Sequence, residues 1–194
     1  MSGKTILRKL PAVITAMMLT TSVFVLAQAH KPVQQRTIGE ALDSWITETE
    51  DHLVPLAEAM PEDKYSFAPP VTYGEFKGVR TFGQQVKHLA ANNYWQVARI
   101  LGETPDLEMT KETGPDSVRT KPEILAYLKG SFQALHKAMA TINEKNVVEP
   151  ITTSNSWQRT RLSAAEDAVA HSFNHYGQLV EYLRMNGIIP PDSR

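Results

Sequence analysis

The 194-residue sequence contains no cysteine. This absence excludes disulfide bonds, thiolate nucleophiles and thiolate metal ligands, so any bound metal ion must be held by histidine or carboxylate side chains. The formal net charge is only −1. Such a chain has no long-range attraction to nucleic acid, which we therefore do not expect as a partner. Internal repeats, low-complexity segments and the alternating pattern of β-strands are also absent.

The first 29 residues differ in composition from the rest of the chain. A short basic start precedes an apolar run over residues 10–26, and Ala27-Gln28-Ala29 then supplies the small-x-small pattern of a signal peptidase site. We predict a signal peptide over residues 1–29, cleaved before His30. A membrane anchor is the alternative, but the run is slightly short for a span and is interrupted by threonine and serine. The protein is thus expected to be exported, periplasmic or secreted, without a stable membrane span after cleavage.

Residues 30–194 are numerous enough to form one domain with its own core. Apolar residues recur with helical spacing in four segments, each of about five turns. The predicted helices are about Thr37–Met60, about Phe82–Leu101, a segment that starts after Thr120, and one that is capped by Ser163 with Glu166 and closes at Gly187. We therefore predict an all-α fold, a four-helix bundle with long connecting loops, preceded by the signal peptide.

Two residues of the first helix and the aromatic residues of the loops allow sharper expectations. Trp45 falls on the apolar stripe and is expected in the core. Pro55 lacks a backbone N–H and should kink or divide the helix. The long connections carry aromatic side chains that should pack over the bundle and border a pocket at its end: Tyr65, Phe67, Tyr73, Phe76 and Trp157.

The last helix carries His171 and His175 one turn apart on the same face. Two imidazoles with this spacing are near enough to share one metal ion, but a zinc-like site needs at least one further protein ligand. The residues above and below the pair are small or neutral, so this face can lie under another helix or line a cavity. The alternative is that both histidines are ordinary polar residues at a helix interface.

Among the other histidines, His88 in the second turn of the second helix is the best candidate for the third ligand. Its position off the densest apolar stripe, taken alone, favours a surface histidine instead. His52 projects nearer an apolar stripe and is expected to be a buried, hydrogen-bonded histidine. The alternatives for His52 are that it hydrogen-bonds to a metal ligand or that it competes as a ligand itself. His136 and His30 are expected to be solvated.

Short motifs in a characteristic order cover nearly the whole of residues 30–194. They are Leu56-Ala57-Glu58-Ala59-Met60-Pro61-Glu62-Asp63-Lys64-Tyr65, Arg80-Thr81-Phe82-Gly83 with His88-Leu89-Ala90, His171-x-x-x-His175-Tyr176-Gly177-Gln178-Leu179 with Tyr182-Leu183-Arg184, and Gly187-x-x-Pro190-Pro191. In this order and spacing they resemble the DinB/YfiT-like family. The resemblance implies a four-helix bundle in which His88, His171 and His175 bind a divalent metal ion, and pairing as a homodimer. Zinc or nickel is the first expectation for the metal, with iron or copper as alternatives, because imidazole suits all four.

The usual general label of this family is metal-dependent hydrolase, so the resemblance implies such an enzyme acting on a small-molecule substrate. An open three-histidine site can act as a Lewis acid, activate water or activate a bound thiol. Thiol S-transfer is the second hypothesis, but Tyr176 stands where some thiol-transferase members have a basic residue, and low-molecular-weight thiols are mainly cytosolic. The third hypothesis is a non-catalytic metal-binding or stress protein, because no clear acid or base accompanies the histidines.

Overall fold

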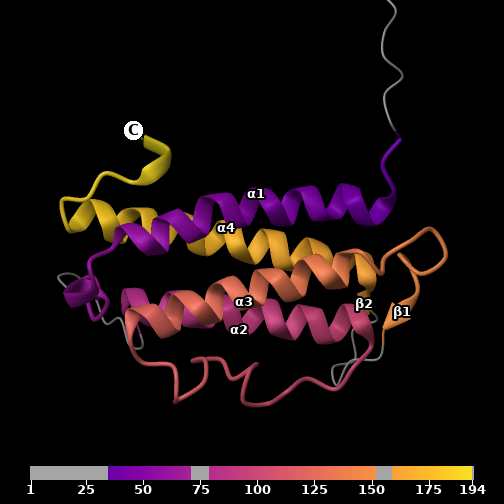
Figure 1. The fold of residues 1–194 in the computed structure, drawn as a ribbon, viewed down its shortest axis with the longest axis horizontal. Helices are drawn as coiled ribbons and strands as arrows, with labels where there is room; N and C mark the ends of the chain where they lie inside the picture. The colour runs from indigo at the N-terminus through magenta and orange to yellow at the C-terminus, as the bar shows by residue number, and fades with distance from the viewer. Residues whose placement is uncertain (1–34, 71–78, 152–158, 194) are drawn as a thin grey trace, which may run out of the picture. The chain divides into compact units, whose positions relative to one another are not determined.

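The structure is a computed structural model that describes residues 35–70, 79–151 and 159–193. These residues form α1 (Ile38–Ala59), α2 (Phe82–Leu101), α3 (Lys121–Met139) and α4 (Arg161–Met185), with two short 3-10 helices, η1 (Glu62–Lys64) and η2 (Pro191–Ser193). The all-α fold is thus confirmed, and Figure 1 shows the four long helices side by side. No helix in this part of the chain is long and apolar enough to cross a membrane. The predicted signal peptide and its cleavage site before His30 lie outside the described residues.

Each long helix begins directly after a threonine that caps it: Thr37, Thr81, Thr120 and Thr160. At the start of α4 the Thr160 hydroxyl accepts a hydrogen bond from the Ser163 backbone N–H at 3.2 Å, and the Ser163 hydroxyl accepts one from the Thr160 N–H at 2.9 Å. This reciprocal pair is a capping box with serine at its third position. The prediction that Ser163 caps the helix with Glu166 was therefore wrong, because Thr160 opens the box and α4 starts earlier, at Arg161.

Helices α2 and α3 run in the same direction, as Figure 1 shows. Gly83 lies against Ile124 near their N-termini, and Asn93 donates to the Ser131 hydroxyl further along, at 3.1 Å. Parallel neighbours need a connection that returns along the whole bundle, so residues 102–120, the crossover loop, must span about 30 Å, the length of the 20-residue α2. This requirement explains why that connection is long.

The core contains apolar side chains from all four helices. The apolar residues that recur with helical spacing in α3 and the turn after it are all buried: Ile124, Leu128, Phe132, Leu135, Met139 and Ile142. Burying one such side chain contributes about 1.5–3 kcal/mol, so this stripe holds α3 firmly against its neighbours. Helix α1 approaches the end of α3 through Gly39, where a Cβ atom would lie only 2.7 Å from the Met139 carbonyl oxygen.

Of the two sharper expectations for the first helix, the one for Trp45 was wrong, and the division of the helix at Pro55 does not occur. Trp45 is 52% exposed, and the adjacent Ile46 is fully buried in its place, whereas Thr49, Leu53 and Leu56 further along the same apolar stripe are buried. Pro55 does not divide α1, which is continuous from Ile38 to Ala59. The missing N–H leaves only the carbonyl of Asp51 without its helical partner, and Asp51 is exposed, so water can satisfy it.

The loop after α1 packs over the bundle as predicted where it is described. Tyr65 is buried, and its hydroxyl donates to the Ala57 carbonyl oxygen at 2.7 Å. Phe67 meets the ring of Tyr182 edge-on, with ring centroids 5.9 Å apart. Three aromatic residues of the predicted pocket border lie outside the described residues: Tyr73, Phe76 and Trp157.

A short antiparallel pair of strands, β1 (Pro150–Ile151) and β2 (Arg159–Thr160), was not predicted. Each strand has only two residues, which is too short for an alternating pattern to be visible in the sequence. The pair closes the connection between α3 and α4 directly before α4 begins. It therefore fixes the N-terminal end of the helix that carries two of the candidate ligands.

Candidate metal centre

His88 of α2 meets His171 and His175 of α4 where these two helices face each other. The ring centroids of His88 and His171 are 5.1 Å apart, those of His88 and His175 4.9 Å, and those of His171 and His175 4.5 Å. One nitrogen from each ring lies within 4.8 Å of the others. Across residues 35–70, 79–151 and 159–193, these three side chains are the one group of at least three histidine or acidic residues that is arranged to hold a metal ion.

Each ring has a nitrogen available for a metal ion. His88 Nδ1 lies 2.9 Å from the Glu112 carbonyl oxygen, which can only accept, so Nδ1 carries the proton and Nε2 keeps its lone pair. His171 Nε2 and His175 Nδ1 are buried and have no hydrogen-bond partner. A buried polar atom without a partner costs about 1–3 kcal/mol. Binding a cation would relieve this cost at both atoms, so the donor set fits a divalent ion.

The spacing of the rings also fits. Ligand nitrogens bound to a tetrahedral ion at about 2.0–2.1 Å lie roughly 3.3–3.4 Å from one another. The nitrogens here lie within 4.8 Å of one another, so each pair would close by at most about 1.4 Å on binding, which side-chain rotation on two rigid helices can supply. Three protein ligands leave at least one coordination position for water or substrate.

The surroundings keep the three histidines neutral at neutral pH, the form that binds metal. Burial lowers the pKa of His88, and its hydrogen bond to Glu112 opposes this shift only in part. Burial also lowers the pKa of His171, with repulsion from His88 as a further cause. For His175, which is 5% exposed, burial and repulsion from the other two histidines lower the pKa to about 3.

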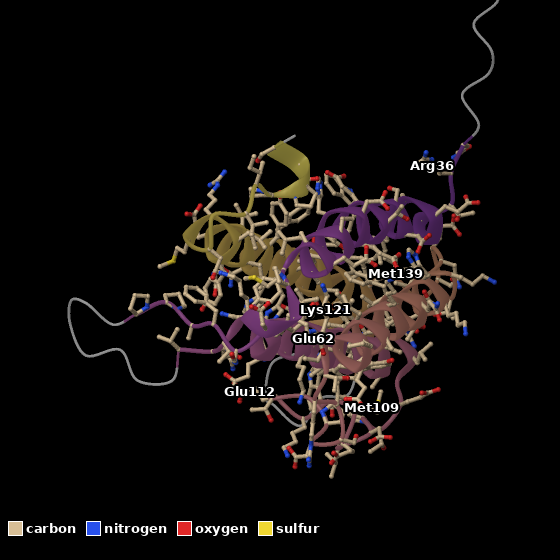
Figure 2. All side chains as sticks on the ribbon, turned by 60° about the vertical axis from the view of Figure 1, so that its left-hand side comes forward. Arg36, Glu62, Met109, Glu112, Lys121 and Met139 are labelled. Carbon is tan, nitrogen blue, oxygen red and sulfur yellow. The ribbon has the colours of Figure 1, made fainter. Side chains whose placement is uncertain are left out.

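Glu112, a residue of the crossover loop that Figure 2 labels, contacts His88 through its backbone and Arg80 through its side chain. Its carbonyl accepts the His88 hydrogen bond, and its carboxylate pairs with the guanidinium of Arg80. The Tyr182 hydroxyl donates to the Arg80 carbonyl at 2.9 Å and so holds that residue in place. The Arg80 charge contributes to the lowered pKa of all three histidines. Burial is nevertheless the largest cause of each lowered pKa, and the Glu112 carboxylate offsets part of the Arg80 charge at His88.

A glutamine pair lies one turn from the histidines on both helices. Gln85 precedes His88 by three residues and Gln178 follows His175 by three, so each lies beside a ligand on its helix face. Gln85 Nε2 donates to Gln178 Oε1 at 2.9 Å. This bond orients the Gln85 amide, whose Oε1 is buried without a partner. Gln85 therefore presents a fixed acceptor one turn from His88.

These residues belong to a longer polar strip along the antiparallel helices α2 and α4, which we call the α2–α4 seam. Near its other end Gln96 Nε2 donates to Asp167 Oδ2 at 2.7 Å. Five of the buried polar atoms without a partner belong to it, carried by Gln85, Asn92, Arg99, His171 and His175. The seam consists of Gln85, His88, Asn92, Gln96 and Arg99 on α2, and Asp167, His171, His175 and Gln178 on α4.

The other described histidines are not part of this cluster. His52 is partly exposed, and its Nδ1 bonds to Asp192 Oδ2 at 2.8 Å, so it is a hydrogen-bonded histidine, as expected, but is not buried. His136 is not simply solvated. Its Nδ1 lies 2.6 Å from Asp43 and its Nε2 2.9 Å from Glu50, so both ring nitrogens donate to carboxylates of α1.

The structure brings together all three histidines that sequence reasoning selected, and adds Gln85, Glu112 and Arg80 beside them. Gln85 could have been found from its i, i+3 spacing to His88. Glu112 could not, because it binds His88 through its backbone carbonyl, which every residue has. The predicted pocket border over residues 65–76 and 154–157 lies largely outside the described residues.

Comparison with known proteins agrees with this fold. Residues 31–179 match the family model of the DinB superfamily. The fold is similar to the crystal structure of a DinB-like protein, YjoA from Bacillus subtilis, with a TM-score of 0.58 and 18% sequence identity over 76% of this chain and 92% of that one. At that identity the likeness concerns the fold alone. A search of curated proteins finds no match.

Proposed function

The chain belongs to the DinB superfamily, and we propose that it binds one divalent metal ion through His88, His171 and His175 and hydrolyses a small-molecule substrate there. The observation that carries the proposal is the pair of buried ring nitrogens without partners on His171 and His175. Beside them, the Glu112 carbonyl fixes the tautomer of His88 that leaves Nε2 free. Such a set of convergent lone pairs is what a divalent cation requires.

The bound ion would supply a Lewis acid that polarises a substrate and activates water near neutral pH. The chain's own residues would then bind and orient. The fixed Oε1 atom of Gln85 accepts a hydrogen bond from a water molecule or from a donor on the substrate. Zinc or nickel is the first choice of ion, with iron or copper as alternatives.

Metal content tests the first half of this proposal. The full chain, purified from producing cells and reloaded with zinc, should hold about one ion per chain by elemental analysis. His171→Ala and His88→Ala should each lose it, because two imidazoles hold a divalent ion much more weakly than three. His52→Ala is the matched control, since His52 lies outside the cluster, and should keep the ion. Equal metal content in all four proteins would refute the site.

Activity then separates the three functional hypotheses. Cobalt-loaded protein should hydrolyse some members of a panel of aryl esters and amides, and His171→Ala should not. A strong sulfur-to-cobalt charge-transfer band on adding 2-mercaptoethanol, without hydrolysis of the panel, would favour thiol S-transfer. An absorption spectrum that no added ligand alters would indicate a closed, non-catalytic site.

We also propose that the protein is exported, which rests on the composition of residues 1–29. Export would separate it from the mainly cytosolic low-molecular-weight thiols and so favours hydrolysis over thiol transfer. Pairing as a homodimer stays a prediction, for which sedimentation velocity of the purified chain is the direct test.

A further inference from the structure

Two arginines share one carboxylate near the end of the α2–α4 seam. Arg99 Nη1 lies 3.7 Å from Asp167 Oδ2, and Arg159 Nη1 lies 3.5 Å from the same atom. Both distances are too long for good hydrogen bonds, and that oxygen already accepts one from Gln96 at 2.7 Å. Among the ion pairs of the described residues, no other carboxylate serves two arginines. The cluster therefore carries one net positive charge.

The guanidinium of Arg99 is poorly satisfied although its side chain is only 11% exposed. Among the described residues, its one hydrogen bond runs from Nη1 to Gln96 Oε1, at 3.2 Å. Its Nε is buried and has no partner in that part of the chain. A guanidinium offers five N–H donors in a planar fork that matches a carboxylate. The unused donors of Arg99 can therefore bind a planar anion such as a carboxylate.

This cluster lies close enough to the metal centre to belong to the same binding site. Asp167 precedes the midpoint of His171 and His175 by six residues on α4, which is about 9 Å along the helix axis. Between the two places, Asn92 follows His88 by one turn, and its buried Oδ1 also lacks a partner. A polar path therefore connects the histidines to the arginines. The outer end of this row of polar side chains reaches solvent, because Arg159 and Asp167 keep about two fifths of their side-chain surface exposed.

We propose that Arg99 and Arg159 form an anion subsite of the metal centre, which binds the carboxylate of a substrate whose reacting group lies on the order of 10 Å away, at the histidines. The net charge of the cluster matches a singly charged carboxylate better than a doubly charged phosphate. The inference rests on the proposed function, since it presumes that the histidines hold an ion. It adds the substrate class: an elongated molecule with a carboxylate at one end and a hydrolysable group near the other.

A purely structural role for this cluster makes a different prediction. If Arg99 and Arg159 only tie β2 and α2 to α4 through Asp167, then removing an arginine and removing the Asp167 charge both weaken the fold. Neither substitution then changes which ligand binds more tightly. If the cluster is an anion subsite, removing an arginine and removing the Asp167 charge have opposite effects on the affinity for the ligand carboxylate. Removing Arg99 removes a partner of the ligand carboxylate, whereas removing the Asp167 charge removes its competitor.

The test uses two series of hydroxamic acids and the zinc-loaded full chain. The hydroxamate end binds the metal ion, a chain of two to eight methylenes follows, and the far end is a carboxylate in one series and a methyl group in the other. Affinities are measured by isothermal titration calorimetry. At roughly 1.2 Å per extended bond, the carboxylate should reach the arginines with about four to six methylenes. There the carboxylate series should bind about tenfold more tightly than the methyl series, as expected for one charge-assisted hydrogen-bonded pair.

Variants then locate the effect. Arg99→Met should abolish the preference for the carboxylate while it keeps zinc and the affinity for the methyl series. Asp167→Asn should increase the preference. Lys137→Met, which removes an exposed cation from α3, is the matched control and should change nothing. Equal affinities of the two series at every length, or a preference that survives Arg99→Met, would overturn the anion subsite. If neither series binds, the proposed metal site itself has failed, and the subsite with it.

Discussion

The buried histidine of the cluster makes the stability of the metal-free protein depend on pH. His175 is 5% exposed, and burial with repulsion from the neighbouring histidines lowers its pKa to about 3, against about 6.5 in an unfolded chain. Between these two values the unfolded state binds a proton that the folded state does not. The contribution of His175 to stability is therefore complete above pH 6.5 and decreases as the pH falls toward 3.

The size of the effect follows from the two pKa values. At pH 5 the unfolded state is stabilised by about 1.36 kcal/mol for each of the 1.5 pH units below 6.5, or about 2 kcal/mol, whereas the folded state is still unprotonated. At pH 7.5 the effect is close to zero. His175→Gln removes the titrating group and keeps a polar side chain. As the pH falls from 7.5 to 5, the unfolding free energy of the wild type should thus decrease by about 2 kcal/mol relative to that of His175→Gln.

Urea unfolding followed by circular dichroism measures this difference, with both proteins stripped of metal by a chelator that is then removed. Any constant cost of the substitution cancels, because only the change with pH is compared. The titrating groups outside the histidine cluster are shared by the two proteins and cancel as well. Parallel curves for wild type and His175→Gln between pH 7.5 and pH 5 would show that His175 is not held neutral by burial, and the account of the centre would be wrong.

Four further outcomes are expected. Burial lowers the pKa of His136, but its bonds to two carboxylates raise the pKa more, so the net shift is upward. His136→Gln should therefore lose most stability below pH 6.5. This loss should become smaller as the pH rises through the folded-state pKa of His136. Gly39→Ala should cost about 1–3 kcal/mol because the added methyl meets backbone oxygens, whereas Gly177→Ala, with open space around it, should stabilise by about 0.5–1 kcal/mol; chemical denaturation measures both. Zinc at a few hundred-fold to a thousand-fold above its dissociation constant should stabilise the wild type by about 3–4 kcal/mol and His171→Ala not at all, by thermal unfolding. Mass spectrometry of protein from the producing cells should find a mature N-terminus at His30, and intact Met1 in the cytosol would contradict export.

The helices were predictable because their determinants are local. Capping boxes at Thr37 and Thr81 fix where α1 and α2 begin, within one residue of the prediction. Burial on α3 follows apolar spacing at every predicted position. Where prediction failed, the competing determinant was tertiary: Trp45 is a strong hydrophobe, yet α1 turns the smaller Ile46 inward. The close approach of α1 to α3 at Gly39 is one reason that this orientation is required.

The candidate site was predictable only in its ligands. Histidine spacing on one helix can be seen in the sequence, but the crossover loop that brings Glu112 to His88 depends on the parallel arrangement of α2 and α3, which no local pattern encodes. The arginine pair was missed for the same reason. Arg99 and Arg159 are sixty residues apart in the sequence, and only the antiparallel packing of α2 and α4, with β2 at its end, brings both to Asp167.

The face of α4 that holds the ligands shows why hydropathy misjudged this helix. Hydrophobicity alone would place Phe173 and Tyr176 in the core, but both are only partly buried, whereas Ala164, Ala168 and His175 are buried. The alanines lie one and two turns along the helix from the histidines and let α2 approach closely, so this face is buried although it is not strongly apolar. A bundle designed only for stability would fill such an interface with leucine. Polar side chains buried here at a cost in stability are therefore better explained by a ligand than by the fold, and the seam as a whole, from Gln85 to Arg99, is the part of the molecule in which to look for substrate binding.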